Sequence, residues 1–95
     1  EIGTLTVILN NGVMTHYSSH MPYATEHYRS NEFSGEYAKV ADGLGAFAQR
    51  VASPDEMAPS IKKALEATKT GQPAVIEMIT KEEETVAKYD LSSRY

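Results

Sequence analysis

The sequence contains no cysteine and no tryptophan, and it is short of large aliphatic side chains. Without cysteine there is no disulfide framework, no thiolate zinc site and no thiol nucleophile, and the absence agrees with a reducing compartment such as the cytoplasm. Leu, Ile, Val and Phe make up 18 of the 95 residues, near the level at which a chain struggles to build its own core. We therefore expect a domain that lacks part of its core.

Two further absences exclude classes of partner. No apolar run approaches the ~20 residues that span a bilayer. Basic residues are outnumbered, with 9 Lys and Arg against 13 Asp and Glu and a net charge of −4 at pH 7. An acidic balance argues against nucleic acid as the main partner, because a phosphate backbone attracts positive charge. The sequence thus predicts a cytoplasmic protein with no membrane span and no nucleic-acid partner.

Three segments carry the pattern of β-strands. Residues 5–9 and 74–79 are short, almost continuously apolar runs, which is typical of strands buried on both faces in a parallel sheet. Residues 46–51 alternate in polarity and predict a shorter strand. The first of these strands ends at a turn signal, Asn-Asn-Gly.

Two segments carry the periodicity of amphipathic helices. The first spans residues 35–44, after a candidate N-cap at Ser34, and its apolar side chains share one face: Tyr37, Val40, Ala41 and Leu44. The second begins at a capping box with Pro54 at the first helical position, in which the side chains of Ser53 and Glu56 each accept from the other's backbone N–H. One face of this helix carries Met57, Ile61, Ala64, Leu65 and Thr68, and the stripe of Met57, Ile61 and Leu65 is predicted to belong to the core.

The segments follow the order strand, long loop, helix, strand, helix, strand. This alternation predicts right-handed crossovers, a parallel sheet and a three-layer α/β/α fold. The long loop, residues 15–36, contains no Val, Ile or Leu, and loops of that length are usually functional or disordered. It leaves from the carboxyl end of the first strand, where such sheets bind ligands, and is therefore predicted to border an active site. Residues 81–95 are predicted to be a charged tail.

The turn at Asn10-Asn11-Gly12 has more than one interpretation. Asn-Gly between apolar runs is the leading short hairpin signal, with residues 13–17 as the returning strand. The amide oxygens could instead cap the next element or bind a hard cation such as Mg²⁺, which prefers oxygen ligands. The residues alone leave these alternatives open.

Several stretches of the chain resemble one family. Residues 7–14 (VILNNGVM) look like the end of the thiamine-diphosphate motif, which opens with Gly-Asp-Gly and closes with a hydrophobic strand and Asn-Asn. Residues 36–45 (EYAKVADGLG), the capping box and residues 72–77 (QPAVIE) follow in the order seen in the acetolactate-synthase-like group. The resemblance implies that residues 1–80 are the C-terminal half of the diphosphate-binding domain.

The resemblance also implies roles at the turn. Asn11 would give its side-chain oxygen to Mg²⁺ and Val13 its backbone carbonyl. Asn10 would hold the turn, and Gly12 would let the backbone approach the diphosphate. The implied cofactor-binding residues are Asn10, Asn11, Gly12, Val13, Met14 and Thr15.

The implied enzyme uses thiamine diphosphate and Mg²⁺ to make or break a C–C bond next to a carbonyl, as a transferase or lyase. An acetolactate-synthase-like carboligase is favoured, with a 2-oxo acid decarboxylase or 2-hydroxyacyl-CoA lyase as alternatives. Its substrate would be a small 2-oxo acid or an acyl-CoA-type compound. An alternative of another class is a small non-catalytic α/β binding module with an Asn-Gly hairpin.

The family pattern includes parts that this sequence does not contain. The Gly-Asp-Gly half and the pyrimidine-binding domain are expected elsewhere in the same enzyme or in a second chain of a split enzyme. The complete protein is expected to be a homodimer or homotetramer. The 95 residues alone are not expected to be active.

The long loop carries three histidines, His16, His20 and His27. A zinc site at the i, i+4 pair His16 and His20 lacks a third ligand at standard spacing. His16 is a candidate substrate contact, because in the family the segment after Asn-Asn borders the active site. The alternative for all three is an exposed polar loop.

Overall fold

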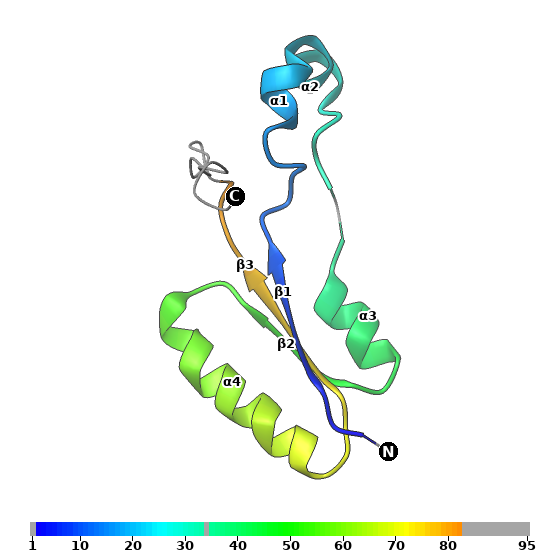
Figure 1. Cartoon of the computed structure of the whole chain (residues 1–95), viewed down its shortest axis with the longest axis vertical. Coiled ribbons are helices and arrows are strands. Elements are labelled where there is room, and N and C mark those ends of the chain that lie inside the picture. The colour runs from blue at the N-terminus through cyan, green and yellow to red at the C-terminus, as the bar shows by residue number, and fades with distance from the viewer. Residues whose placement is uncertain (1, 34, 83–95) are drawn as a thin grey trace, which may run out of the picture.

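The computed structural model describes residues 2–33 and 35–82, and its centre is a sheet of three parallel strands (Figure 1). The strands are β1 (Leu5–Asn10), β2 (Phe47–Val51) and β3 (Ala74–Ile79). Their order is β1-β3-β2, so β3 is central and pairs in parallel with both neighbours. The predicted parallel sheet is confirmed. The hairpin alternative is wrong, because β1 pairs with β3 and residues 13–17 form no strand beside it.

Helices cover the two faces of the sheet. Figure 1 shows α3 (Tyr37–Gly43) on one side and α4 (Pro54–Lys69) on the other, which confirms the predicted three layers. Successive side chains of a strand point to opposite faces, so β3 divides its residues between the two helices. The core lies on the α4 side and consists of Val51, Ala64, Ala74, Ile76 and Met78, with Leu5, Phe47, Met57 and Ile61 packed against it.

Helix α4 begins where the sequence predicts, but without the expected capping box. Ser53 is the N-cap, yet its side chain makes no capping hydrogen bond. The Glu56 N–H donates to the Ser53 backbone carbonyl at 3.1 Å, which occupies the donor that the hydroxyl was predicted to take. The predicted core stripe is confirmed for Met57 and Ile61, whereas Leu65 is 47 % exposed.

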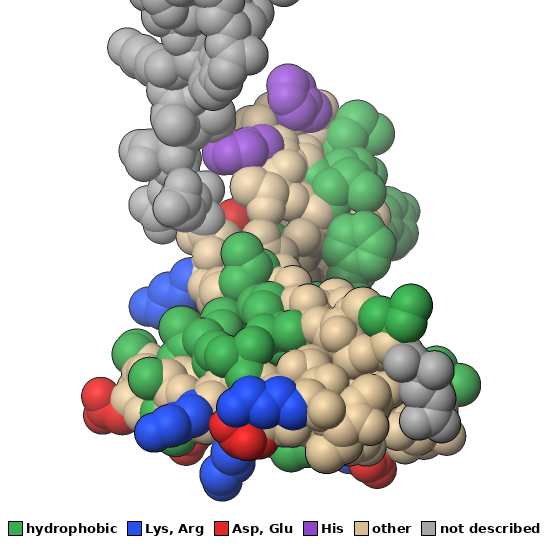
Figure 2. Space-filling model, turned by 60° about the horizontal axis from the view of Figure 1, so that its bottom comes forward, with side chains coloured by type: hydrophobic (Ala, Val, Ile, Leu, Met, Phe, Trp, Pro, Cys, Tyr) green, Lys and Arg blue, Asp and Glu red, His purple; other side chains and the backbone are tan. Residues whose placement is uncertain are grey.

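Helix α3 turns an unexpected face to the sheet. Its buried residue is Ala38, while Val40 and Leu44 of the predicted apolar face are 62 % and 84 % exposed. The predicted N-cap, Ser34, lies outside the described residues, and the N-cap position is held by Glu36 without a side-chain capping bond. Figure 2 shows a patch of hydrophobic side chains near the middle of the face in view and a second group at its upper right. Two of the four side chains on the predicted apolar face of α3 are thus exposed within the described part of the chain.

The predicted long loop contains two short helices, α1 (Tyr17–His20) and α2 (Pro22–Tyr28). Neither buries a residue, and neither contains a Val, Ile or Leu. Because aliphatic periodicity is missing, the residue pattern carries no helix signal here. Figure 1 shows both helices beyond the carboxyl ends of the strands. The predicted tail lies outside the described residues from residue 83 onward, and no described helix is long and apolar enough to cross a membrane.

Candidate functional site

The turn after β1 is shaped by the side chains of its two asparagines. The Gly12 N–H donates to Asn10 Oδ1 at 2.9 Å, and the Val13 N–H donates to Asn11 Oδ1 at 3.1 Å. Asn11 Nδ2 donates to Thr15 Oγ1 at 2.7 Å, which fixes the orientation of the Asn11 amide. Each asparagine thus bonds to the backbone two residues on, the pattern by which Asn stabilises tight turns.

Gly12 gives the turn its backbone conformation. Its φ is +74°, in the left-handed region, and a Cβ atom there would meet no atom within 4 Å. We expect Gly12→Ala to destabilise the protein by about 1–2 kcal/mol through backbone strain alone. Gly43→Ala is the matched control, because Gly43 is helical with equally open space, so alanine should stabilise by roughly 0.5–1 kcal/mol. Equal unfolding midpoints for the two variants in thermal denaturation would contradict this account.

A short antiparallel bridge joins the two ends of the segment that contains α1 and α2. Val13 pairs with Glu32, the Met14 N–H donates to the Asn31 carbonyl at 2.7 Å, and the Phe33 N–H donates to the Gly12 carbonyl at 2.8 Å. Residues 14–31, which we call the α1–α2 lobe, therefore leave the sheet and return to it beside the turn. Within the described residues, no hydrogen bond is donated to the Val13 carbonyl oxygen.

The turn lines two small clefts. Asn10, Asn11, Gly12 and Phe33 are common to both, and each has a volume of about 190 Å³. One is completed by Gly35, Arg50, Ile79 and Thr80, and the other by Ile8, Leu9, Val13 and Tyr37. Pockets that enclose a drug-sized ligand run from about 300 to 1,000 Å³, so each cleft has room for only part of a cofactor.

Glu77 is a site residue that the sequence reasoning did not single out. Its side chain lies in the middle of β3 and is 0 % exposed. Its Oε2 accepts from Asn10 Nδ2 at 2.7 Å, and its Oε1 accepts from the Ala38 N–H at 3.1 Å. The available signal was a single carboxylate within the apolar run AVIEMI, because a charge buried in a sheet requires partners.

The contacts of Glu77 keep it ionised. Burial of the carboxylate raises its pKa, but the donors, Asn10 foremost, and the positive charge of Arg50 outweigh this effect and hold the pKa of Glu77 below its usual value of 4.5. A folded-state pKa that lies below the unfolded one means that the native state releases the proton more readily. The resulting stability is present in full above about pH 4.5 and is lost as the pH falls through the lowered pKa.

Glu77 should therefore contribute to the acid sensitivity of the fold. We expect the unfolding midpoint of the wild type to fall more steeply between about pH 4.5 and pH 2 than that of Glu77→Gln, which has no proton to take up there. Thermal unfolding followed by circular dichroism over that pH range measures the difference. Parallel profiles for the two proteins would show that Glu77 does not titrate as its surroundings require.

The oxygen atoms at the turn fit a hard cation. Asn11 Oδ1 accepts a single described hydrogen bond and a carbonyl-type oxygen has two lone pairs, so one remains for a ligand. The Val13 carbonyl offers a second neutral oxygen. Mg²⁺ takes such ligands and completes its octahedron with waters and substrate phosphates. Among residues 2–33 and 35–82 no cluster of three or more His, Cys, Asp or Glu side chains competes as a metal site.

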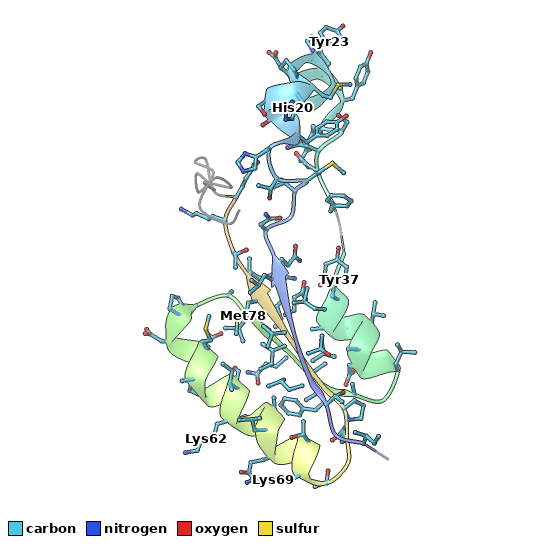
Figure 3. The ribbon with its side chains drawn as sticks, in the orientation of Figure 1. His20, Tyr23, Tyr37, Lys62, Lys69 and Met78 are labelled. Carbon is cyan, nitrogen blue, oxygen red and sulfur yellow. The ribbon has the colours of Figure 1, made fainter. Side chains whose placement is uncertain are left out.

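The histidines are spread over the lobe rather than gathered at a site. His16 is half-buried at the base of α1 and has a left-handed φ of 63°. Its backbone N–H donates to Glu82 Oε1 at 3.2 Å. Figure 3 places His20 on the lobe, and Tyr23 stacks on His27 with ring centroids 3.9 Å apart. The described residues supply no third ligand for zinc at His16 and His20. Of the three, His16 lies nearest along the chain to the turn.

Parallel strands between helical layers, with a polar turn at the carboxyl end of an edge strand, are typical of the class of α/β domains that bind ligands at the ends of their strands. The chain belongs to the thiamine pyrophosphate enzyme family: the model of its C-terminal TPP binding domain matches residues 1–78. Thiamine pyrophosphate is thiamine diphosphate under its other name. Comparison with curated proteins and with solved structures finds no match. The predicted family and fold are confirmed, and the acetolactate-synthase-like group stays a prediction.

Proposed function

We propose that this chain holds the Mg²⁺–diphosphate end of thiamine diphosphate in an enzyme that makes or breaks a C–C bond next to a carbonyl. The observation that carries the proposal is the turn after β1. There, the Asn11 side-chain oxygen and the Val13 carbonyl are both neutral oxygen donors beside a glycine with a φ of +74°. Diphosphate oxygens and water complete the coordination of Mg²⁺.

The residues of the turn have different roles in binding Mg²⁺ and the diphosphate. Asn11 and Val13 hold the cation, while Asn10 fixes the turn through the Gly12 N–H. Gly12 has no side chain, so the backbone comes close to the diphosphate. Met14 and Thr15 follow on the cofactor side, and Thr15 Oγ1 also accepts a hydrogen bond from Asn11 Nδ2. When bound, the cofactor supplies the electron sink for carbanion chemistry, and the protein supplies position and charge.

The proposed enzyme includes more than this chain. We propose that the Gly-Asp-Gly half of the diphosphate-binding domain and the pyrimidine-binding domain come from the same enzyme, assembled as a homodimer or homotetramer. The exposed apolar side chains of α3, Val40 and Leu44, support this, because large uncovered apolar residues mark surfaces where other parts of a protein pack. The reaction we favour is acetolactate-synthase-like carboligation of small 2-oxo acids, catalysed by a transferase or lyase.

Cofactor titration of the complete enzyme tests the binding part of the proposal. Calorimetry of the apoenzyme should show saturable binding of thiamine diphosphate with Mg²⁺ present and little binding with EDTA. Absence of Mg²⁺-dependent binding would overturn the proposal. Product analysis then tests the reaction: a 2-oxo acid gives a coupled product in carboligation and an aldehyde in simple decarboxylation, whereas a lyase cleaves a 2-hydroxyacyl-CoA. Either of the last two results would replace carboligation.

A further inference from the structure

One buried carboxylate links three elements beneath the turn. Glu77 projects from β3, the central strand, and its two oxygens bond to the end of β1 through Asn10 and to the first turn of α3 through Ala38. The α3 helix has no side-chain cap of its own, so the Ala38 N–H is one of the donors that a helix start leaves without a partner. Glu77 therefore satisfies α3 and the turn at the same time.

The chemistry of the pair determines which way Asn10 faces. An ionised carboxylate only accepts hydrogen bonds, whereas an amide has a donor end and an acceptor end. Glu77 must therefore face the NH₂ group of Asn10, at 2.7 Å, which leaves Asn10 Oδ1 to accept from the Gly12 N–H. If the Asn10 amide were reversed, two acceptors would meet at Glu77 and two donors at Gly12.

We propose that Glu77 is a positioning residue for the cofactor site: its carboxylate orients the Asn10 amide and so holds Asn11 and Gly12 in the turn. This inference rests on the proposed function, since it deepens the account of the same site. Glu77 touches neither of the two proposed metal ligands and acts through Asn10. Its effect should therefore appear in the affinity for the cofactor as well as in stability.

A swap of the two side-chain types provides the test. Glu77→Gln cannot accept from both Asn10 and Ala38 with carboxylate oxygens, so one of these bonds is lost. Asn10→Asp places a second acceptor against Glu77. In the double variant, the side-chain amide at position 77 can donate an N–H to one oxygen of the carboxylate at position 10. The oxygen of that amide still accepts from the Ala38 N–H. The other oxygen of that carboxylate accepts from Gly12. The double variant thus restores every bond with the polarity of the central one reversed, and the net charge is kept.

The complete enzyme and its variants are titrated with thiamine diphosphate at fixed Mg²⁺, and their cofactor-free unfolding midpoints are measured. Each single variant should bind about 10–100-fold more weakly, as is found when a group that supports a metal ligand is removed. The double variant should bind thiamine diphosphate at least roughly tenfold more tightly than either single variant, as expected for two groups in direct contact. Glu66→Gln, at an exposed glutamate on α4, should bind within about twofold of the wild type.

Recovery in the double variant supports the inference, because the losses from two unrelated structural contacts would add up. Single variants that bind like the wild type would overturn it, as would a double variant no better folded and no tighter than the worse single one. If the wild type itself does not bind the cofactor with Mg²⁺, the proposed function fails. The cofactor-free unfolding midpoints still decide in that case whether Glu77 orients the Asn10 amide, since rescue of stability by the swap requires the same paired polarity.

Discussion

Replacing Asn11 with alanine should weaken Mg²⁺-dependent binding of thiamine diphosphate by at least about 100-fold, because removing groups that only support metal ligands already costs 10–100-fold. Asn11 Oδ1 is the proposed side-chain ligand, and it also accepts from the Val13 N–H at 3.1 Å. Alanine removes the ligand oxygen and loosens the position of Val13, the source of the second oxygen. Calorimetric titration of the complete apoenzyme at fixed Mg²⁺ measures the loss.

Thr15→Val is the matched control for this experiment. It removes the hydroxyl that accepts a hydrogen bond from Asn11 Nδ2 at 2.7 Å, and it leaves the Asn11 side-chain oxygen in place. The cost should be about tenfold, the lower end of the range for a group that supports a metal ligand, since an exposed hydrogen bond contributes only about 0.5–1.5 kcal/mol. If Asn11→Ala binds as tightly as Thr15→Val, the Asn11 oxygen is not a ligand and the metal site lies elsewhere.

The sheet could be predicted from the sequence because its strands have a strong local signal. The runs LTVIL and AVIEMI are almost continuously apolar, and helical segments separate the strands, so a parallel sheet was the simplest arrangement. From the same topology, the carboxyl end of β1 is the predicted ligand-binding end. These inferences needed no knowledge of side-chain contacts.

Two features could not be predicted because they depend on contacts far apart in the sequence. Glu77 and Asn10 are separated by 67 positions, and no local pattern pairs them. The face of α3 that meets the sheet was also missed: apolar periodicity pointed to Val40 and Leu44, but the Ala38 N–H is held by Glu77 and Ala38 is buried. A hydrogen bond from a distant strand thus anchors the first turn of a short helix whose hydrophobic pattern favours another face.

The α1–α2 lobe shows a different limit. Its helices bury no residue and contain no aliphatic side chain to mark a helix face. They are fixed instead by backbone bonds and by i, i+4 contacts such as the Tyr23–His27 stack, with centroids 3.9 Å apart. Contacts of this kind leave no hydrophobic period, so sequence reasoning predicted a loop.

The two faces of β3 should separate stability from cofactor binding. Ile76 and Glu77 are neighbours and both are 0 % exposed, but Ile76 belongs to the core on the α4 side and Glu77 faces α3 and the turn. Ile76→Ala should lower the free energy of unfolding by about 2–5 kcal/mol, the cost of a cavity in a packed core. The exposed Lys62→Ala, on α4, should change it by no more than about 0.5 kcal/mol.

Well below its unfolding midpoint, the Ile76→Ala enzyme should bind thiamine diphosphate and Mg²⁺ nearly as the wild type does, because the missing methyl groups face away from Asn10. Thermal denaturation and calorimetric titration of the same preparations provide both values. A loss of cofactor affinity as large as that expected for Glu77→Gln would mean that the conformation of the turn depends on the packing of the whole sheet. Unchanged affinity with reduced stability would mean that the turn depends on the hydrogen bonds of one face of β3, while the opposite face carries the core.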